Sequence, residues 1–238
     1  MKKIKCLIFL SSMFLNGAFF LSCSSEEKEN AGPEEGIQSK NMITKYVMPE
    51  SLSVVAIPNY SETDASFRVE IKGLIASRIL VEHEQRGDVI LSEREINPKD
   101  YERSIELFDS LSIANKDTSY NRKVPMEGYT AIAYSIDSIS VVSNSDYDSK
   151  HPAGTELGDI IKIEANTYGA YILDGYNNQN PKLKIKKSIS DLTEKDKVLM
   201  SNDMQFFIPK GEKLSKHRLV FSIFTAGTKL SKSVELEL

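Results

Sequence analysis

The chain has 238 residues, of which 40% are hydrophobic and 27% are charged. This composition excludes a collagen-like chain, a disulfide-dense scaffold and a multi-pass membrane protein. The formal net charge of −4 provides no basic footprint for phosphate groups, so we expect no nucleic-acid partner.

The N-terminus has the layout of a secretory signal peptide. Three lysines among the first five residues form a positive start, residues 7–21 are mostly apolar, and Cys23 follows. A membrane-spanning helix needs about 20 predominantly apolar residues, and this run is shorter. We therefore expect residues 1–22 to be removed, which leaves 27 basic and 34 acidic residues, a net charge near −7.

The end of this segment, Phe20-Leu21-Ser22-Cys23, resembles the lipobox of bacterial lipoproteins, although Phe20 stands where that motif usually has Leu. The resemblance implies that the thiol of Cys23 is acylated and that Cys23 becomes the first mature residue. Each buried methylene contributes about 0.8 kcal/mol, so two or three acyl chains would hold the protein on a membrane. Cys6 lies inside the signal, so we expect no disulfide.

Residues 23–43 are expected to form the lipidated cysteine and a flexible tether. Residues 24–38 are polar and acidic, with too few apolar groups to offset the entropy of folding. The acidic cluster at residues 26–29 is similar to the surface-export signal of Bacteroidetes lipoproteins, and a generic solvated linker is the alternative. We expect an outer-membrane protein that faces outward, or else lies on the periplasmic face.

The first elements after the tether are predicted from apolar spacing. Residues 65–81 alternate at first and later approach helical spacing, so we expect two strands broken near Gly73. Residues 98–108 have apolar groups at roughly helical intervals, which indicates a short helix or turn. Residues 105–113 then alternate as in a strand, which could pair with the Val/Ile-rich residues 134–141.

The second half continues in short segments. Residues 161–163 and 168–173 indicate two further strands, and residues 190–200 suit a brief helix. Residues 206–208 indicate a short strand that a Pro-Lys-Gly turn stops. In residues 219–238 apolar positions alternate on both sides of an Ala-Gly turn, which predicts a terminal hairpin.

Many short strands with turn signals between them favour a mainly β fold, a β-sandwich of immunoglobulin-like or similar type. We expect one β-rich domain over residues 44–238, with a possible sub-boundary near residue 104. Three features mark its later part: Gly128-Tyr129-Thr130-Ala131, the loop Asp146-x-Asp148-x-x-His151-Pro152-Ala153-Gly154, and the terminal hairpin. By these features, residues 104–238 look similar to Bacteroidetes lipoprotein domains of unknown function, a resemblance that brings no activity with it.

Candidate catalytic groups are few. The histidines His83, His151 and His217 have none of the short spacings of a metal site, and we expect each to be a surface or loop residue. Four glutamates could share strand faces and serve acid-base glycoside chemistry: Glu82, Glu84, Glu93 and Glu95. Solvated strand faces are the alternative explanation for them.

A weak calcium candidate is the loop that begins at Asn144, where Asn144, Asp146 and Asp148 carry oxygen at alternate positions. The pattern then fails, because Ser149 replaces the glycine of the sharp turn and Glu156 comes one residue too late for the bidentate ligand. We expect a polar turn between strands, with no metal and no other cofactor.

A candidate ligand surface lies in residues 168–180, which combine tyrosines with amides. Aromatic faces stack on the C–H faces of sugars, and amides hydrogen-bond sugar hydroxyls. The candidate contacts are Tyr168, Tyr171, Tyr176 and Asn178. A strand followed by a turn is the alternative, and the chain has no Trp, the aromatic residue that such surfaces use most readily.

These patterns predict a non-catalytic binding or accessory module at the cell surface. Its partners would be the membrane, through the lipid anchor, and a glycan or another surface protein. An assembly or adhesion subunit is the alternative, because exposed strand edges can accept a partner strand. A glycoside-active enzyme that uses the four glutamates is the third reading.

Overall fold

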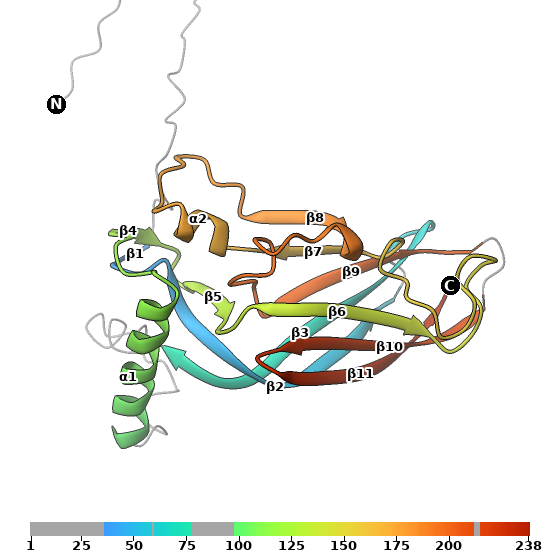
Figure 1. Ribbon diagram of the computed structural model, residues 1–238, viewed down its shortest axis with the longest axis horizontal. Helices are drawn as coiled ribbons and strands as arrows, with labels where there is room; N and C mark the ends of the chain where they lie inside the picture. The colour runs from blue at the N-terminus through green and yellow to red at the C-terminus, as the bar shows by residue number, and fades with distance from the viewer. Residues whose placement is uncertain (1–35, 59, 78–97, 212–214) are drawn as a thin grey trace, which may run out of the picture.

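The computed structural model describes residues 36–58, 60–77, 98–211 and 215–238, and its regular structure is mainly β (Figure 1). The strands are β1 (Ile37–Ser39), β2 (Ile43–Ile57), β3 (Asp64–Ser77), β4 (Arg122–Val124), β5 (Tyr129–Ile132), β6 (Ile136–Ser143), β7 (Lys162–Asn166), β8 (Lys184–Ser188), β9 (Asp203–Pro209), β10 (Lys216–Thr225) and β11 (Thr228–Glu237). The helices are α1 (Pro98–Ala114) and α2 (Gly169–Leu173), with a 3-10 helix at Ile189–Asp191. The predicted signal peptide, Cys23 and the candidates Glu82, His83, Glu84, Glu93 and Glu95 lie outside the described residues.

Two sheets pack face to face as a β-sandwich, as the sequence predicts. The larger sheet has the strand order β5-β2-β3-β9-β7-β8, and the smaller has the order β11-β10-β6. Among the described strands, neighbours run antiparallel except for β2 and β5, which run parallel. A small ribbon of β1 and β4 forms a separate sheet beside α2 (Figure 1).

The main core lies between these two sheets. Its centre is an aromatic group made of Phe67 on β3, Phe206 on β9 and Phe221 on β10, all fully buried. The rings of Phe67 and Phe206 stack with centroids 5.2 Å apart, and Phe206 meets Phe221 edge-to-face at 4.8 Å. Since two of these rings come from one sheet and the third from the other, the group joins the two layers.

The predicted terminal hairpin is confirmed. Strands β10 and β11 pair over their full length, and Thr225 lies opposite Thr228 at the turn. Ala226 and Gly227 have φ values of 48° and 73°, both in the left-handed region. A two-residue turn with positive φ at both positions matches the right-handed twist of the flanking strands.

The expected break near Gly73 is wrong, because β3 continues through it. The irregularity is in the partner strand, where the register of β2 shifts between Pro49 and Ser51. A Cβ atom at Gly73 would overlap the carbonyl oxygen of Met48. Gly73 therefore lets β3 continue past the bulge opposite by leaving room for the carbonyl of Met48, which is a common role for glycine inside a strand.

The expected strand over residues 105–113 is also wrong, since α1 extends to Ala114. Phe108, Leu111 and Ser112 are buried while Ile113 is 69% exposed, which is a helical and not an alternating pattern. The helix that the sequence predicts over residues 98–108 is thus present but longer. The strand β6, which was expected to pair with residues 105–113, pairs with β10 instead.

The strand expected over residues 168–173 is wrong, because Gly169–Leu173 form the helix α2. The start of this helix lies so close to Val198 that a Cβ atom at Gly169 would come within 2.6 Å of it, so glycine is the residue that fits there. The brief helix expected over residues 190–200 is limited to the 3-10 helix, after which the chain continues through turns.

The domain starts earlier than expected and does not divide at residue 104. Residues 37–39 pair with β4, and Met42 and Ile43 are buried, so the end of the expected tether belongs to the fold. Residue 104 lies inside α1, and β3 pairs with β9 across the proposed boundary. Strands from both parts of the chain therefore share one sheet.

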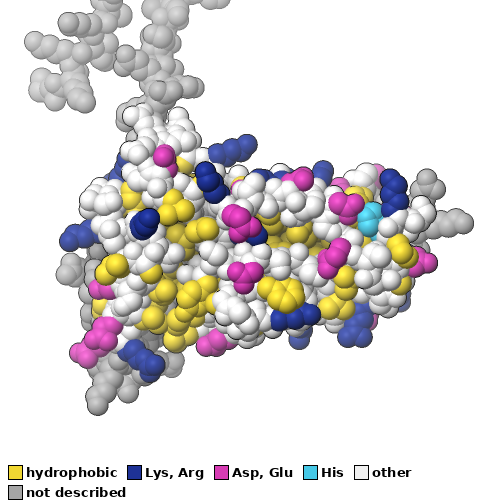
Figure 2. Space-filling model, viewed as in Figure 1, with side chains coloured by type: hydrophobic (Ala, Val, Ile, Leu, Met, Phe, Trp, Pro, Cys, Tyr) yellow, Lys and Arg dark blue, Asp and Glu magenta, His cyan; other side chains and the backbone are white. Residues whose placement is uncertain are grey.

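A second cluster of buried side chains lies at the α1 end of the sandwich. It includes Met42, Tyr46, Phe108, Leu111 and Tyr176, which come from β2 and the residue before it, from α1 and from the segment after α2. Within the described ranges, no helix is long and apolar enough to cross a membrane. On the face shown in Figure 2, acidic and basic side chains are interspersed and neither sign dominates.

Candidate functional site

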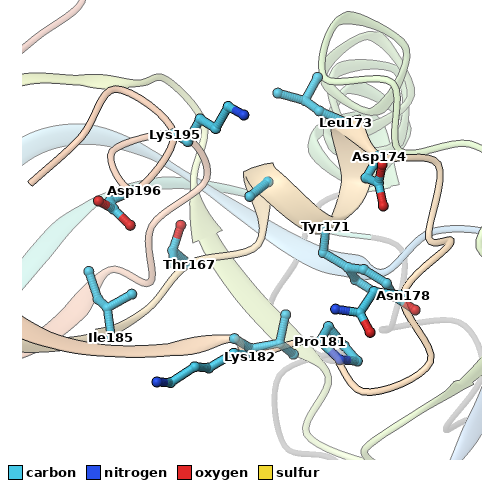
Figure 3. A pocket seen from close by; sticks show the side chains of 12 residues that line it. Thr167, Tyr171, Leu173, Asp174, Asn178, Pro181, Lys182, Ile185, Lys195 and Asp196 are labelled. Carbon is cyan, nitrogen blue, oxygen red and sulfur yellow. The ribbon is translucent and has the colours of Figure 1, made fainter.

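The candidate site is a cavity of about 500 Å³ beside α2. One wall is α2 and the segment that leads from it to β8, and the other is the turn at residues 193–197. The lining residues are Thr167, Ala170, Tyr171, Leu173, Asp174, Asn178, Pro181, Lys182, Leu183, Ile185, Lys195 and Asp196 (Figure 3). The cavity is therefore built from residues that lie within 30 positions of one another along the chain.

A sharp reversal after α2 shapes one end of the cavity. Gly175 and Tyr176 have φ values of 68° and 60°, and the amide of Tyr176 donates to the carbonyl of Tyr171 at 3.1 Å. Two consecutive left-handed residues turn the chain back on itself, as at many helix C-termini. This reversal brings Asp174 and Asn178 to the same side of the cavity (Figure 3).

The predicted aromatic surface is mostly core. Tyr168, Tyr171 and Tyr176 are only 3%, 7% and 4% exposed. Burial raises the pKa of Tyr168 to about 12, and its ring packs against Tyr129. Tyr168 and Tyr176 therefore cannot offer a face to a ligand. The structure brings only Tyr171 and Asn178 of the four candidates together on the cavity wall.

Tyr171 is held in place from behind. Its hydroxyl accepts a hydrogen bond from Nη1 of Arg122 at 2.8 Å, and its ring meets Tyr176 edge-to-face with centroids 5.5 Å apart. Arg122 also donates from Nη2 to the carbonyl of Tyr176 at 3.2 Å. Because these contacts fix both the ring and the chain reversal, this wall of the cavity is preformed.

Asp117 lies beneath this wall and is 0% exposed. The sequence did not predict a role for it. Its Oδ1 accepts from the amide of Met42 and from the hydroxyl of Tyr176, and its Oδ2 from the amide of Ile43 at 2.7 Å and the hydroxyl of Tyr46. Burial raises the pKa of Asp117 even though these hydrogen bonds favour the charged form. We call Asp117 and these four donors the Asp117 clamp.

The charged groups of the cavity differ in how they are paired. Oδ2 of Asp196 accepts from Nζ of Lys187 at 2.9 Å and from the amide and hydroxyl of Thr193, each at 2.7 Å. Partial burial alone would raise the pKa of Asp196, but the hydrogen bonds from Lys187 and Thr193 lower it below its ordinary value. Asp196 is therefore an anion that its own neighbours already neutralise.

The calcium candidates use their oxygens within the protein. Oδ1 of Asn144 accepts from the amide of Arg218 at 2.8 Å, and Oδ1 of Asp146 accepts from the amide of Ala153 at 2.7 Å. Asp148 accepts from the amide of His151 at 2.8 Å. Among the described residues, no group of three or more His, Cys, Asp or Glu side chains is placed to hold a metal ion. The loop is a hydrogen-bonded polar turn.

The two described histidines are buried: His151 lies in a loop, whereas His217, for which a surface or loop position was expected, lies on β10. His151 lies between two carboxylates, with Nδ1 at 2.8 Å from Asp148 and Nε2 at 3.1 Å from Asp159. His217 lies among serine hydroxyls, 2.9 Å from Ser143 and 2.7 Å from Ser215. Both rings have partners on each nitrogen and anchor the loops at the end of the sandwich opposite α1.

No match was found when the chain was compared with protein-family models, with curated proteins and with solved structures. The site must therefore be interpreted from its own chemistry.

Proposed function

We propose that this chain is a lipid-anchored binding module of the cell envelope, which takes a carbohydrate in the cavity beside α2 and does not transform it. The cavity is the observation that carries the proposal. Its volume of about 500 Å³ falls within the range of about 300 to 1,000 Å³ that is typical of small-ligand sites.

The chemistry of the lining supports a carbohydrate. Leu173, Pro181 and Ile185 provide apolar surface for the C–H faces of a sugar, and Asp174 and Asn178 provide groups that pair with hydroxyls. In Figure 3, Asp174 and Asn178 lie at one end beside Leu173 and Pro181, and Ile185 lies at the other end near Asp196. Apolar and polar side chains thus lie next to one another along the cavity, which suits a ligand that has both apolar C–H faces and hydroxyls.

A binding role without catalysis is supported by the state of the carboxylates. Glycoside hydrolysis uses a pair of carboxyl groups, one of which acts as a general acid and needs a raised pKa. Asp174 and Asp196 line the cavity, but the pKa of Asp196 is lowered by the hydrogen bonds from Lys187 and Thr193. Asp196 is thus a poor proton donor at neutral pH.

The ligand proposal is tested with the mature chain in detergent micelles on an array of neutral and acidic oligosaccharides. We expect saturable binding that Asn178→Ala weakens about two- to tenfold, the effect of removing one polar contact. Asn180→Ala is the matched control, because Asn180 lies in the same loop and does not line the cavity. Equal effects of the two variants, or a blank array, would reject the cavity as a glycan site.

The anchor proposal rests on the N-terminal sequence and has a separate test. Cys23→Ala removes the thiol that the lipid would occupy. We expect the variant to leave the membrane fraction, and protease treatment of intact cells to cleave the parent if it faces outward. A variant that fractionates with membranes as the parent does would show that another segment holds the protein there.

An assembly or adhesion subunit is the second candidate, and one observation favours it. β11 is a ten-residue strand at the end of the strand order of the smaller sheet, so a partner strand could add along the part of it that does not lie against β2. Its exposed positions carry Lys229 and Lys232, however, and lysines on an edge strand discourage such pairing. Cross-linking of intact cells that gives a ladder of this chain would favour assembly over ligand binding.

A further inference from the structure

The lysines around β8 fall into two groups. Four of them have a carboxylate partner: Lys184 and Lys186 pair with Glu164, Lys187 with Asp196, and Lys197 with Glu194. Lys182 and Lys195 have no hydrogen bond or ion pair with any described residue. Both of these unpaired lysines line the cavity, and none of the four paired lysines does.

The unpaired lysines lie on opposite sides of the cavity. In Figure 3, Lys195 stands on the turn at residues 193–197 and Lys182 on the segment that leads to β8, and the side chain of Lys182 points away from the other labelled residues. A ligand between them would meet an ammonium group on each side once these exposed side chains rotate toward it. Long lysine side chains can swing toward such a ligand because no protein carboxylate holds them.

The lining of the cavity has a net positive charge once the ion pair between Lys187 and Asp196 is taken into account. Asp196 is neutralised by Lys187, which leaves Asp174 as the one lining carboxylate with no cationic partner among the described residues. Lys182 and Lys195 together exceed that single negative charge. The chain as a whole is acidic, with 34 acidic against 30 basic residues, so this local excess runs against the overall charge.

From this arrangement we infer that the cavity selects an acidic carbohydrate, whose anionic group binds Lys182 or Lys195 while its hydroxyls meet Asp174 and Asn178. The inference rests on the proposed function and adds the charge of the ligand to it. Carboxylate and sulfate groups are both strong acceptors for an ammonium donor, so either could supply the anionic group. A neutral sugar would leave both lysines unpaired.

The test compares three trisaccharides of one linkage by titration calorimetry with the mature chain in detergent micelles: a galacturonic acid trisaccharide, its neutral galactose counterpart and a sulfated galactose form. We expect at least one acidic form to bind more tightly than the neutral form. Lys182→Gln and Lys195→Gln should each weaken that binding about two- to fivefold, the usual range for one exposed ion pair. Raising the salt concentration should weaken it as well.

The matched controls are Lys184→Gln and Lys186→Gln, which remove the same charge from lysines that pair with Glu164 outside the cavity. We expect no change in affinity for the acidic form. A loss equal to that of the cavity variants would assign the effect to the general field of the face and overturn the inference.

Failure of the inference is distinct from failure of the proposed function. If the neutral trisaccharide binds as tightly as both acidic forms and the cavity lysine variants have no effect, the inference is wrong and a glycan site remains. If none of the three binds and the array is blank, the proposed function fails and the inference fails with it. Unchanged melting temperatures of the variants show that any loss of binding is not a loss of fold.

Discussion

The sandwich core and the second cluster, at the α1 end, are both built from buried side chains, but different forces hold them. The first is apolar throughout, with Phe67, Phe206 and Phe221 in ring contact. The second surrounds the Asp117 clamp, in which one buried carboxylate takes four hydrogen bonds. The stability of an apolar core depends on the volume and area that its side chains fill, whereas the stability of a buried polar cluster depends on the identity of each hydrogen-bond donor and acceptor.

The largest expected effect comes from cutting the apolar core. Phe206→Ala should lower the free energy of unfolding by about 3–5 kcal/mol, because it removes a ring that touches both sheets and leaves a cavity. Phe206→Leu should cost much less, since the replacement keeps much of the volume. Urea unfolding curves measure both losses. Val55→Ala, at a residue that is 58% exposed, is the control and should stay within about 0.5 kcal/mol.

A smaller but more specific loss is expected at the clamp. Asp117→Asn keeps the size of the side chain but presents an NH₂ group to two of the four donors, whichever way the amide turns. Leaving buried donors unsatisfied should lower the free energy of unfolding by about 2–3 kcal/mol. Asp191→Asn, on an exposed side chain, should have no measurable effect. A clamp variant as stable as the parent would remove the distinction between the two clusters.

The pH dependence of the same variant sharpens this prediction. Burial raises the pKa of Asp117 in the folded state above its ordinary value of 3.8, so the folded protein holds this proton more tightly than the unfolded chain. The contribution of Asp117 to stability therefore increases as pH falls from neutral through its folded-state pKa and levels off below 3.8. The difference in stability between parent and Asp117→Asn should grow in that direction, and a difference independent of pH would contradict it.

The smallest effect is expected at the buried ring of His151, which pairs with two exposed carboxylates. The hydrogen bond that His151 donates to Asp148 raises the pKa of His151 above 6.5, and the contact with Asp159 raises it further. A raised folded-state pKa contributes stability below pH 6.5, and that stability is lost as pH rises through the folded-state pKa. The melting temperature of His151→Gln should thus fall furthest below the parent near pH 5.5 and approach it near pH 8.5. An equal deficit at both pH values would mean that packing, and not charge, sets the role of His151.

The same contrast explains what the sequence could and could not predict. Apolar alternation about Ala226 and Gly227 is a local signal, and the hairpin it predicts is present. The alternation of residues 105–113 is local too, yet burial in α1 follows Phe108 and Leu111 and leaves Ile113 exposed. Short apolar runs fit either period, and only tertiary packing decides between them.

The Asp117 clamp could not be predicted from the sequence. Asp117 lies in a stretch that reads as a loop, and its donors come from residues about 70 positions earlier and 59 later in the chain. Two of the residues that line the cavity could be predicted from the sequence, because Tyr171 and Asn178 lie in a segment rich in aromatics and amides. Lys182 and Lys195 gave no signal, since being unpaired is a property of the folded arrangement.

The clamp also joins the entrance of the chain to the wall of the cavity. Asp117 accepts from the amides of Met42 and Ile43, just after the chain enters the domain, and from Tyr176, which closes the reversal behind α2. Arg122 on β4 makes a second link, because β4 pairs with β1 and Arg122 binds Tyr171. If the protein is tethered at its N-terminus, as proposed, tension on the tether would be transmitted through β1 and the Asp117 clamp to the wall of the cavity beside α2.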